Sequence, residues 1–171
     1  TGCRGQLGTE LQRQLAEEGC VLGPLPERLR KATVIPVDVD ELDITDREAT
    51  INYIRRHQPD TVVNCAAVTN VDGCETARDA AFRVNAIGPR NLALACDKVN
   101  ARLVHISTDY VFPGTPNGGV PLDECAQPAP ISLTARPNCW ASSMSATSAA
   151  ATSSCARPGS TATTAKISSR P

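Results

Sequence analysis

Glycine at every third position near the start of the chain constrains the fold more than any other feature. The motif spans Gly2–Gly8 and leads into an amphipathic run, in which Leu7, Leu11 and Leu15 recur at helical spacing. A glycine turn that enters a helix leaves backbone N–H groups free at the positive end of the helix dipole, where a phosphate can approach closely. Three glycines are also compatible with a plain tight turn. A nucleotide-binding interpretation therefore requires a strand before the motif and an acidic residue at the end of the next strand.

The chain begins at Thr1, with no methionine and no apolar run ahead of the glycines. The first strand of a nucleotide-binding βαβ unit is central to its sheet. We therefore expect the sequence to be a fragment that lacks this strand.

The composition indicates a single domain with dispersed charge. The 171 residues carry a net charge of −1, and the scattered Lys and Arg argue against nucleic acid or a membrane as a partner. No apolar run is long enough to span a bilayer, and we expect a cytoplasmic protein. The eight cysteines show neither C-x-x-C pairs nor zinc spacing, so we expect free thiols and no metal site.

An acidic residue follows the first helix at the expected place. Residues 34–38 are predicted to form a short strand, weakened by Pro36, that ends at Asp38. A carboxylate there can accept hydrogen bonds from the adenosine ribose and would repel a 2′-phosphate. Asp38 is equally compatible with a solvated loop beside Asp40 and Glu41.

The rest of the chain alternates between helix and strand. Helices are predicted over residues 45–57 and 75–99, the second interrupted at Gly88-Pro89, and buried strands over residues 61–67 and 102–107. This alternation predicts an α/β fold, a Rossmann-like doubly wound parallel sheet that is incomplete because its first strand is missing. The small residues that end the 61–67 strand leave room for a cofactor.

Two polar residues follow the last predicted strand. Ligands of such sheets bind beyond the carboxyl ends of the strands, which places Thr108 and Asp109 at the mouth of the site. A hydroxyl there can polarise a substrate carbonyl towards hydride attack, or it can simply cap backbone groups. We expect His105 to be a packed core residue and His57 to lie on the surface.

Six motifs resemble those of a known family, the dTDP-4-dehydrorhamnose reductases, which are extended short-chain dehydrogenases/reductases that make dTDP-L-rhamnose. The resemblance covers residues 1–133 and rests on Gly5–Gly8, Leu42–Asp46, Val63–Thr69, Val71-Asp72, Val84–Gly88 and His105–Phe112. It implies NADPH or NADH as cofactor, a sugar-nucleotide substrate and reduction of its 4-keto group, and it is compatible with a homodimeric parent.

The resemblance also implies individual roles. Thr108 matches the Ser/Thr of the family's catalytic triad, and Asp109 would touch the substrate beside it. The remaining positions would bind the cofactor. Its pyrophosphate would lie against Gly2, Gly5, Gln6, Leu7 and Gly8, its adenosine ribose against Asp38, and its adenine against Asp43 and Ile44. The cofactor would also contact Ala66, Ala67 and Val68 at the end of the third strand.

One family motif is missing. A Tyr-x-x-x-Lys segment follows Pro-Ala-Pro in the family, where the Tyr donates the proton and the Lys lowers its pKa. Pro128-Ala129-Pro130 is present here, but no such segment follows it, and Tyr110 has Gly114 four residues later. We therefore expect this chain to be inactive. We also expect it to be unstable alone, because a central strand is missing.

The composition changes at residue 134. Ala, Ser and Thr make up 24 of the 38 residues of 134–171, without the periodicity of a helix or a strand. A disordered low-complexity tail is one interpretation. A frameshift is the interpretation we favour, because codons for residues 134–145 can be chosen so that one restored base encodes Tyr-Gly-Lys-Thr-Lys, which contains the missing motif. Residues 1–133 are thus expected to be a partial NAD(P)-binding domain, and residues 134–171 a non-native tail.

Two other functions stay open. The same motifs resemble the non-catalytic, NADP-binding regulatory β subunit of methionine adenosyltransferase, which would explain an absent Tyr/Lys pair in an intact reading frame. Another sugar-nucleotide epimerase or reductase of the same superfamily is the third possibility.

Overall fold

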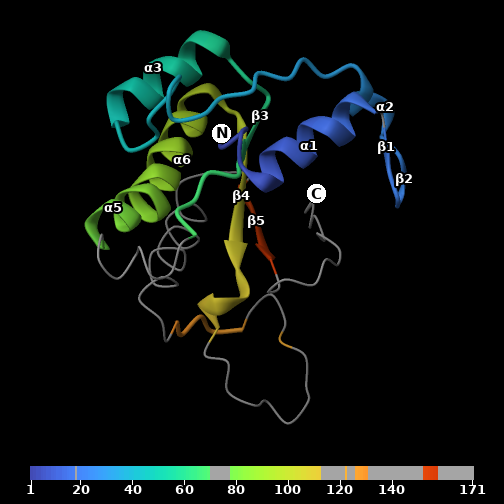
Figure 1. The fold of residues 1–171 in the computed structure, drawn as a ribbon. Helices are drawn as coiled ribbons and strands as arrows, with labels where there is room; N and C mark the ends of the chain where they lie inside the picture. Colours follow the sequence, from blue (N-terminus) through green and yellow to red (C-terminus); the bar gives the residue numbers. More distant parts are fainter. Residues whose placement is uncertain (18, 70–77, 113–121, 123–125, 131–151, 158–171) are drawn as a thin grey trace.

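A parallel three-stranded sheet forms the centre of the molecule (Figure 1). The computed structural model describes residues 1–17, 19–69, 78–112, 122, 126–130 and 152–157. The sheet has the order β3-β4-β5, formed by Thr61–Asn64, Arg102–Thr108 and Thr152–Arg157. Its register pairs Asn64 of β3 with His105 of β4, so the carboxyl ends of these two strands lie at the same edge.

Helices lie on both sides of these strands. Helix α1 (Gln6–Ala16) lies on one side, and α3 (Arg47–His57) and α6 (Gly88–Val99) lie next to each other on the other side (Figure 1). A small hairpin of β1 (Gly19–Cys20) and β2 (Gly23–Pro24) and the short helix α2 (Glu27–Arg30) follow α1. This arrangement confirms the predicted Rossmann-like α/β fold.

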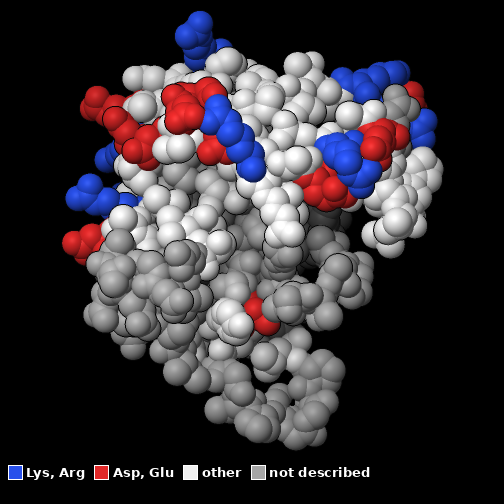
Figure 2. Space-filling model, viewed as in Figure 1, with Lys and Arg blue, Asp and Glu red and all other residues white. Residues whose placement is uncertain are grey.

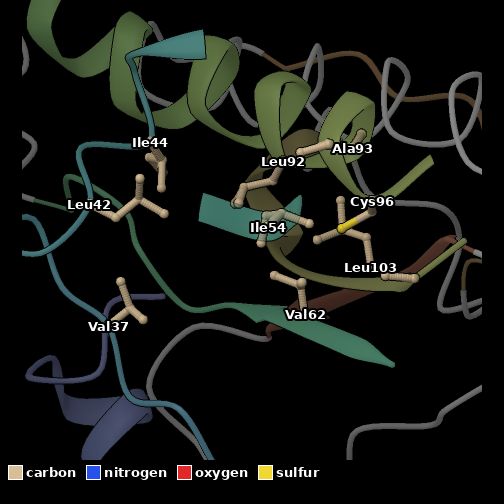
Figure 3. Packing of buried hydrophobic residues seen from close by; sticks show 11 residues of the cluster. Val37, Leu42, Ile44, Ile54, Val62, Leu92, Ala93, Cys96 and Leu103 are labelled. Atoms are coloured by element: carbon tan, nitrogen blue, oxygen red, sulfur yellow. The ribbon is translucent and has the colours of Figure 1, made fainter. Parts of the chain in front are cut away.

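The core lies between the sheet and the pair α3–α6. Its buried cluster includes Ile54 of α3, Leu92 and Cys96 of α6, Val62 of β3 and Leu103 of β4 (Figure 3). The segment before α3 closes one end of this cluster with residues 37, 42 and 44. The core therefore joins the two strands that carry the predicted site.

Helix α3 begins two residues later than the sequence predicts, at Arg47 instead of Thr45. The side chain of Asp46 is the N-cap and accepts a hydrogen bond from the N–H of Ala49 at 2.9 Å. Gln58 ends the helix in a left-handed conformation with φ of 45°. The predicted helix over residues 45–57 is thus confirmed to within its first turn.

The predicted break near Gly88-Pro89 takes the form of a π-helical turn. Helix α5 (Arg78–Phe82) runs into the π-helix η1 (Arg83–Ile87), and α6 follows directly. Pro89 has no N–H to donate to Asn85, so regular α-helical bonding cannot continue through this point. The side chain of Asn85 is buried and hydrogen-bonds to the backbone of Val68, in the segment that follows β3.

Residues 34–38 do not form the predicted strand. Among the described residues, one backbone–backbone hydrogen bond joins this segment to the glycine loop, from the N–H of Cys3 to the carbonyl of Val37 at 3.2 Å. Pro36 cannot donate to a ladder, and Val34 and Ile35 are 45% and 44% exposed. The segment nevertheless anchors Val37, which is 5% exposed, in the core.

Strand β5 lies in the stretch where the sequence predicts no regular element. Thr152–Arg157 pairs in parallel with β4, from Leu103↔Thr152 to Thr108↔Arg157. A ladder uses backbone N–H and C=O groups, so residues without an apolar period can still form one. The remainder of the predicted 134–171 tail lies outside the described residues.

Cys3, Cys20, Cys65 and Cys96 are free thiols. Among the residues that the structure describes, no helix has the length and apolar character needed to cross a membrane. Within the same ranges, no group of three His, Cys, Asp or Glu side chains is arranged to hold a metal ion. On the face shown in Figure 2, acidic and basic side chains are interspersed over the described surface.

Candidate functional site

The glycine loop is packed against the carboxyl end of β3. The amino group of Thr1 donates to the carbonyl of Val63 at 2.7 Å, and the N–H of Cys65 donates to the carbonyl of Thr1 at 3.1 Å. This is the bonding pattern of a neighbouring parallel strand. Thr1 therefore borders β3 on the side away from β4, and the loop begins where that strand ends.

Gly2 makes the closest approach between the loop and the sheet. Its φ is +71°, and a Cβ built there would lie 2.5 Å from the backbone nitrogen of Ala66. Any side chain would thus clash with β3 as well as strain the backbone. The sequence–structure match is specific, because the loop can lie this close to the strand only with glycine at this position.

The third glycine brings helix α1 against the loop. A Cβ on Gly8 would lie 2.1 Å from the carbonyl oxygen of Gly2. Gly5 is the N-cap, and no side chain caps the helix there. Gln6 and Leu7 are exposed in the first turn. The first amides of α1 are therefore at a surface without a capping side chain, which suits an anion.

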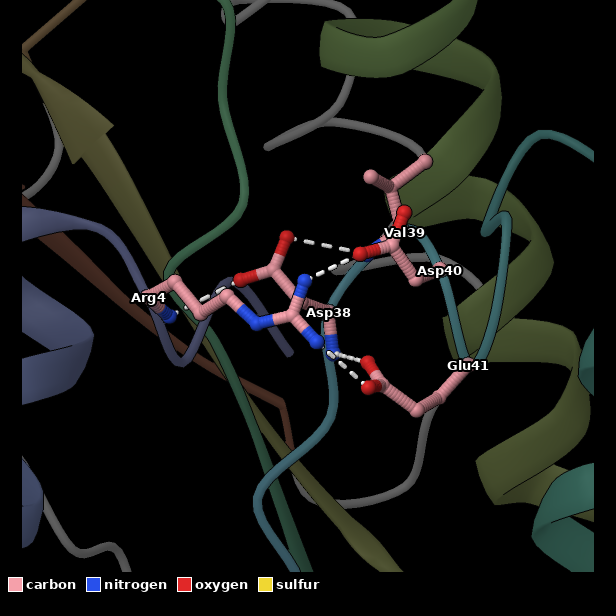
Figure 4. Close-up of polar contacts among 5 residues, drawn as sticks. All are labelled: Arg4, Asp38, Val39, Asp40 and Glu41. Carbon is pink, nitrogen blue, oxygen red and sulfur yellow. Dashed lines mark hydrogen bonds and ion pairs between the residues drawn. The ribbon is translucent and has the colours of Figure 1, made fainter.

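Asp38 lies beside this loop, as the sequence predicts. Its Oδ2 accepts the N–H of Arg4 at 2.8 Å, and its Oδ1 accepts the N–H of Val39 at 2.9 Å (Figure 4). These two backbone bonds lower the pKa of the Asp38 carboxyl, so it is ionised at neutral pH. The Cys3 side chain also hydrogen-bonds to this carboxylate. An ionised carboxylate has about four lone-pair sites, so about one is left for a further donor.

Arg4 is a residue of this region that the sequence reasoning missed. Its guanidinium forms ion pairs with Asp40 and Glu41, which follow Asp38 in the chain (Figure 4). The hydrogen bond to Asp40 and then the negative charge of Glu41 raise the pKa of Arg4. The available signal was a basic residue inside the glycine motif, but only the fold brings it to acids 36 and 37 residues away.

The end of β3 is held by two asparagines. The Oδ1 of Asn64 accepts the N–H of Ala66 at 3.1 Å, which ends the strand at Asn64 rather than at residue 67. Asn85, buried in η1, accepts the N–H of Val68 at 2.8 Å and donates to its carbonyl at 2.9 Å. The predicted cofactor-contacting stretch, including the exposed Ala67, is therefore fixed from both sides.

Asp43 and Ile44 differ in their accessibility. Asp43 is exposed, and its Oδ1 accepts the N–H of Thr45 at 2.8 Å. The Ile44 side chain is 5% exposed and packs against Gly88, so it belongs to the core. Asp43 is the accessible member of the predicted adenine-binding pair.

Thr108 and Asp109 lie at the end of β4, at the same edge of the sheet as Ala67. The hydroxyl of Thr108 donates to Asp109 Oδ1 at 3.2 Å and accepts the N–H of Tyr110 at 3.3 Å. Thr108 thereby caps the short 3-10 helix η2 (Asp109–Val111). Both bonds are long, so the capping role leaves the hydroxyl able to reorient towards a ligand.

A buried histidine of β4 lies next to the last residue of β3. His105 is 2% exposed, and its burial lowers its pKa to about 4, so the ring is neutral. Its Nδ1 lies 3.1 Å from Asn64 Nδ2. The predictions of a core position for His105 and a surface position for His57 are confirmed.

Comparison with known proteins identifies the family. The family model described as the RmlD substrate binding domain matches residues 1–142. The chain belongs to this family. Its relatives include dTDP-4-dehydrorhamnose reductases of Mycobacterium tuberculosis, 44% identical over 71% of this chain, and of Streptomyces griseus, 45% identical over 72%. The chain spans only 35% and 36% of the length of these two reductases.

Solved structures of the same family share the fold. A dTDP-4-dehydrorhamnose reductase of Clostridium acetobutylicum superimposes with a TM-score of 0.78 and 37% identity, over 90% of this chain and 50% of that one. The Bacillus anthracis reductase, solved in complex with NADP, has a TM-score of 0.79 and 33% identity, over 92% of this chain and 51% of that one. The resemblance drawn from the motifs is thus confirmed at the level of the family, which is one of reductases.

Proposed function

We propose that this RmlD-family chain is the coenzyme-binding part of a reductase that converts dTDP-4-dehydro-L-rhamnose to dTDP-L-rhamnose. The observation that carries the proposal is the convergence of the Gly2–Gly8 loop, Asp38 and the ends of β3 and β4 at one edge of the sheet. Relatives at 44% and 45% identity are named as dTDP-4-dehydrorhamnose reductases.

The shape of the loop fits a dinucleotide. The Gly2 and Gly8 positions have no room for a Cβ, and the exposed first turn of α1 has no capping side chain. NADPH or NADH, when bound, would supply a hydride to the substrate carbonyl. We assign the pyrophosphate to the loop with Gln6 and Leu7, the adenosine ribose to Asp38, the adenine to Asp43 with the Ile44 backbone, and the nicotinamide side to residues 66–68.

Thr108 would bind the reacting ketone. Its hydroxyl proton now faces Asp109 Oδ1 across 3.2 Å. A ketone oxygen at the mouth would take this hydrogen bond, while the N–H of Tyr110 keeps its bond to the hydroxyl oxygen. The hydrogen bond would stabilise the negative charge that develops on the ketone oxygen as the carbonyl is reduced. Asp109 Oδ1, which now accepts the Thr108 hydroxyl, would accept a hydroxyl of the sugar in its place.

The chain as it stands would lack the proton donor for this reaction. Its two tyrosines are Tyr53 and Tyr110, and the residues four positions later are His57 and Gly114. We propose that residues 1–133 are a partial NAD(P)-binding domain and that residues 134–171 are read in a shifted frame. The end of the family match at residue 142, soon after the change in composition, supports this division.

The experiment is to resequence the gene from upstream of codon 1 through codon 171 and to assay the repaired protein. The proposal predicts one missing base near codons 133–134 and NADPH oxidation by the repaired protein with dTDP-4-dehydro-L-rhamnose. Thr108→Ala should lower its kcat by about 100-fold, because one donor to the developing oxyanion is lost. Thr61→Ala, at the opposite end of the sheet, is the matched control. The catalytic proposal would be contradicted if the reading frame of this chain is genuine both upstream of codon 1 and at codons 133–134.

A genuine frame would favour a second function. A chain without Tyr-x-x-x-Lys that still binds NADP would resemble the non-catalytic regulatory β subunit of methionine adenosyltransferase. Co-purification of a partner enzyme with the unmodified chain would then support the regulatory function.

A further inference from the structure

Arg4 in the glycine loop is held by carboxylates of the segment that follows Asp38. Its Nη1 pairs with Asp40 Oδ2, and its Nη2 lies 2.6 Å from Glu41 Oε1 (Figure 4). Its backbone N–H donates to Asp38 Oδ2 at 2.8 Å. Both terminal nitrogens of the guanidinium are therefore engaged with acids of the chain itself.

The acidic side of this contact is preorganised. The second carboxylate oxygen of Glu41 accepts the N–H of Asp38 at 2.9 Å, so the carboxylate bridges Asp38 and Arg4. The N–H groups of Glu41 and Leu42 both donate to the carbonyl of Asp38, at 3.1 and 2.9 Å. Leu42 is 6% exposed and anchors this turn in the core. The Glu41 carboxylate is thus held by the backbone of a tight turn, whereas the 70% exposed Asp40 side chain is bound by Arg4.

The charge around Asp38 is unfavourable for a phosphate on the 2′-oxygen of the adenosine ribose, which NADPH has and NADH lacks. The carboxylates of Asp40 and Glu41 pair with the guanidinium of Arg4, and that of Asp38 accepts the backbone N–H of the same residue. A phosphate monoester carries nearly two negative charges at neutral pH and would have to displace carboxylates to reach Arg4. The basic residues that precede this segment in the sequence have other partners, since Arg30 Nε donates to the carbonyl of Leu25 and Lys31 pairs with Glu27.

We propose that Asp40 and Glu41 form an acidic latch on Arg4, which withholds this guanidinium from the 2′-phosphate of NADPH and makes the chain prefer NADH. The inference rests on the proposed function, because it places the adenosine ribose at Asp38. The 2′-hydroxyl of NADH can donate to a remaining lone pair of Asp38, whereas a 2′-phosphate meets three carboxylates. Opening the latch should convert Arg4 into a ligand for that phosphate.

The test is calorimetric titration of the full 171-residue chain with NADH and NADPH, and with 5′-AMP and adenosine 2′,5′-bisphosphate. The unmodified chain should bind NADH at least about tenfold more tightly than NADPH. The double variant Asp40→Asn/Glu41→Gln should bind NADPH and the bisphosphate about tenfold more tightly than the unmodified chain, with little change for NADH. Adding Arg4→Ala to the double variant should abolish that gain.

Glu27→Gln is the matched control, because it removes one exposed carboxylate that is paired with Lys31 outside the loop. It should leave the ratio of the two affinities unchanged. Equal binding of NADH and NADPH by the unmodified chain would overturn the latch, as would a double variant with an unaltered ratio. Failure of every nucleotide to bind would instead overturn the proposed function, and the latch with it.

Discussion

Asn64 Nδ2 donates a hydrogen bond across 3.1 Å to the Nδ1 of the buried His105, directly below the glycine loop. The orientation of the amide follows from its other partners. Asn64 Oδ1 accepts the backbone N–H of Ala66 and the hydroxyl of Thr1, so the NH2 group must face the ring. The proton of the neutral imidazole is consequently on Nε2. One asparagine therefore joins the first residue, the end of β3 and the centre of β4.

The buried His105 should make stability depend on pH. Its pKa is about 4 in the folded chain and near 6.5 when unfolded, so the unfolded state binds the proton more readily between these values. The free energy of unfolding is not reduced by this group above pH 6.5, and it falls as the pH is lowered from 6.5 towards 4. The loss amounts to about 3 kcal/mol in total.

Urea unfolding at several pH values measures this dependence. Because carboxylates also titrate in the acid range, the informative quantity is the difference between the unmodified chain and His105→Asn, which removes the titrating ring. The pH dependence should be weaker in that variant. His57→Asn, on the exposed end of α3, should retain the full dependence. Equal pH profiles for His105→Asn and the unmodified chain would contradict the assignment.

Removing the Asn64 side chain should destabilise the fold. Asn64→Ala leaves the N–H of Ala66 and the Nδ1 of His105 without their described partner, and Asn64 is 1% exposed. We expect a loss of about 2–3 kcal/mol in the free energy of unfolding, typical of buried polar groups left unpaired. Asn52→Ala, at an exposed position of α3, is the control in the same denaturation experiment. A similar loss in both variants would show that the buried network contributes little.

A methyl group at Gly88 should be incompatible with Ile44. A Cβ built on Gly88 would lie 2.6 Å from Ile44 Cδ1 and 2.7 Å from its Cγ1. Gly88→Ala should therefore destabilise the chain by about 1–3 kcal/mol despite the better helix propensity of alanine. The same substitution in an Ile44→Ala background should be neutral or stabilising. Thermal unfolding of the four proteins gives the coupling, and additive effects would contradict direct contact.

Local patterns were sufficient to predict the elements that surround the site. The capping-box spacing of residues 45–48 predicts α3, and the apolar runs predict β3 and β4, because these signals depend on residues close in sequence. The glycine motif predicts the turn that approaches β3. The paired carbonyl and N–H groups of Thr1 could not be predicted, since they depend on the neighbouring strand.

Contacts between residues far apart in the sequence account for the differences between the predicted and the observed structure. Residues 34–38 have a strand-like composition but lack the ladder, and β5 has the ladder without a strand-like pattern. The ion pairs of Arg4 join residues that are brought together only when the glycine loop packs beside the 38–42 turn. Asn64 and Asn85 belong to motifs that were recognised, yet their buried bonds become visible only when β3, β4 and η1 are assembled.

The central claim is that the Gly2–Gly8 loop on the end of β3 binds a nicotinamide dinucleotide. Its most direct test is NADH binding by the full chain, compared with Gly2→Ala and Gly23→Ala. Both glycines have positive φ, but only a Cβ on Gly2 meets other atoms, since nothing lies within 4 Å of one on Gly23. We predict saturable binding that Gly2→Ala weakens by at least about tenfold and Gly23→Ala preserves. No saturable binding, or equal binding by all three proteins, would contradict the account.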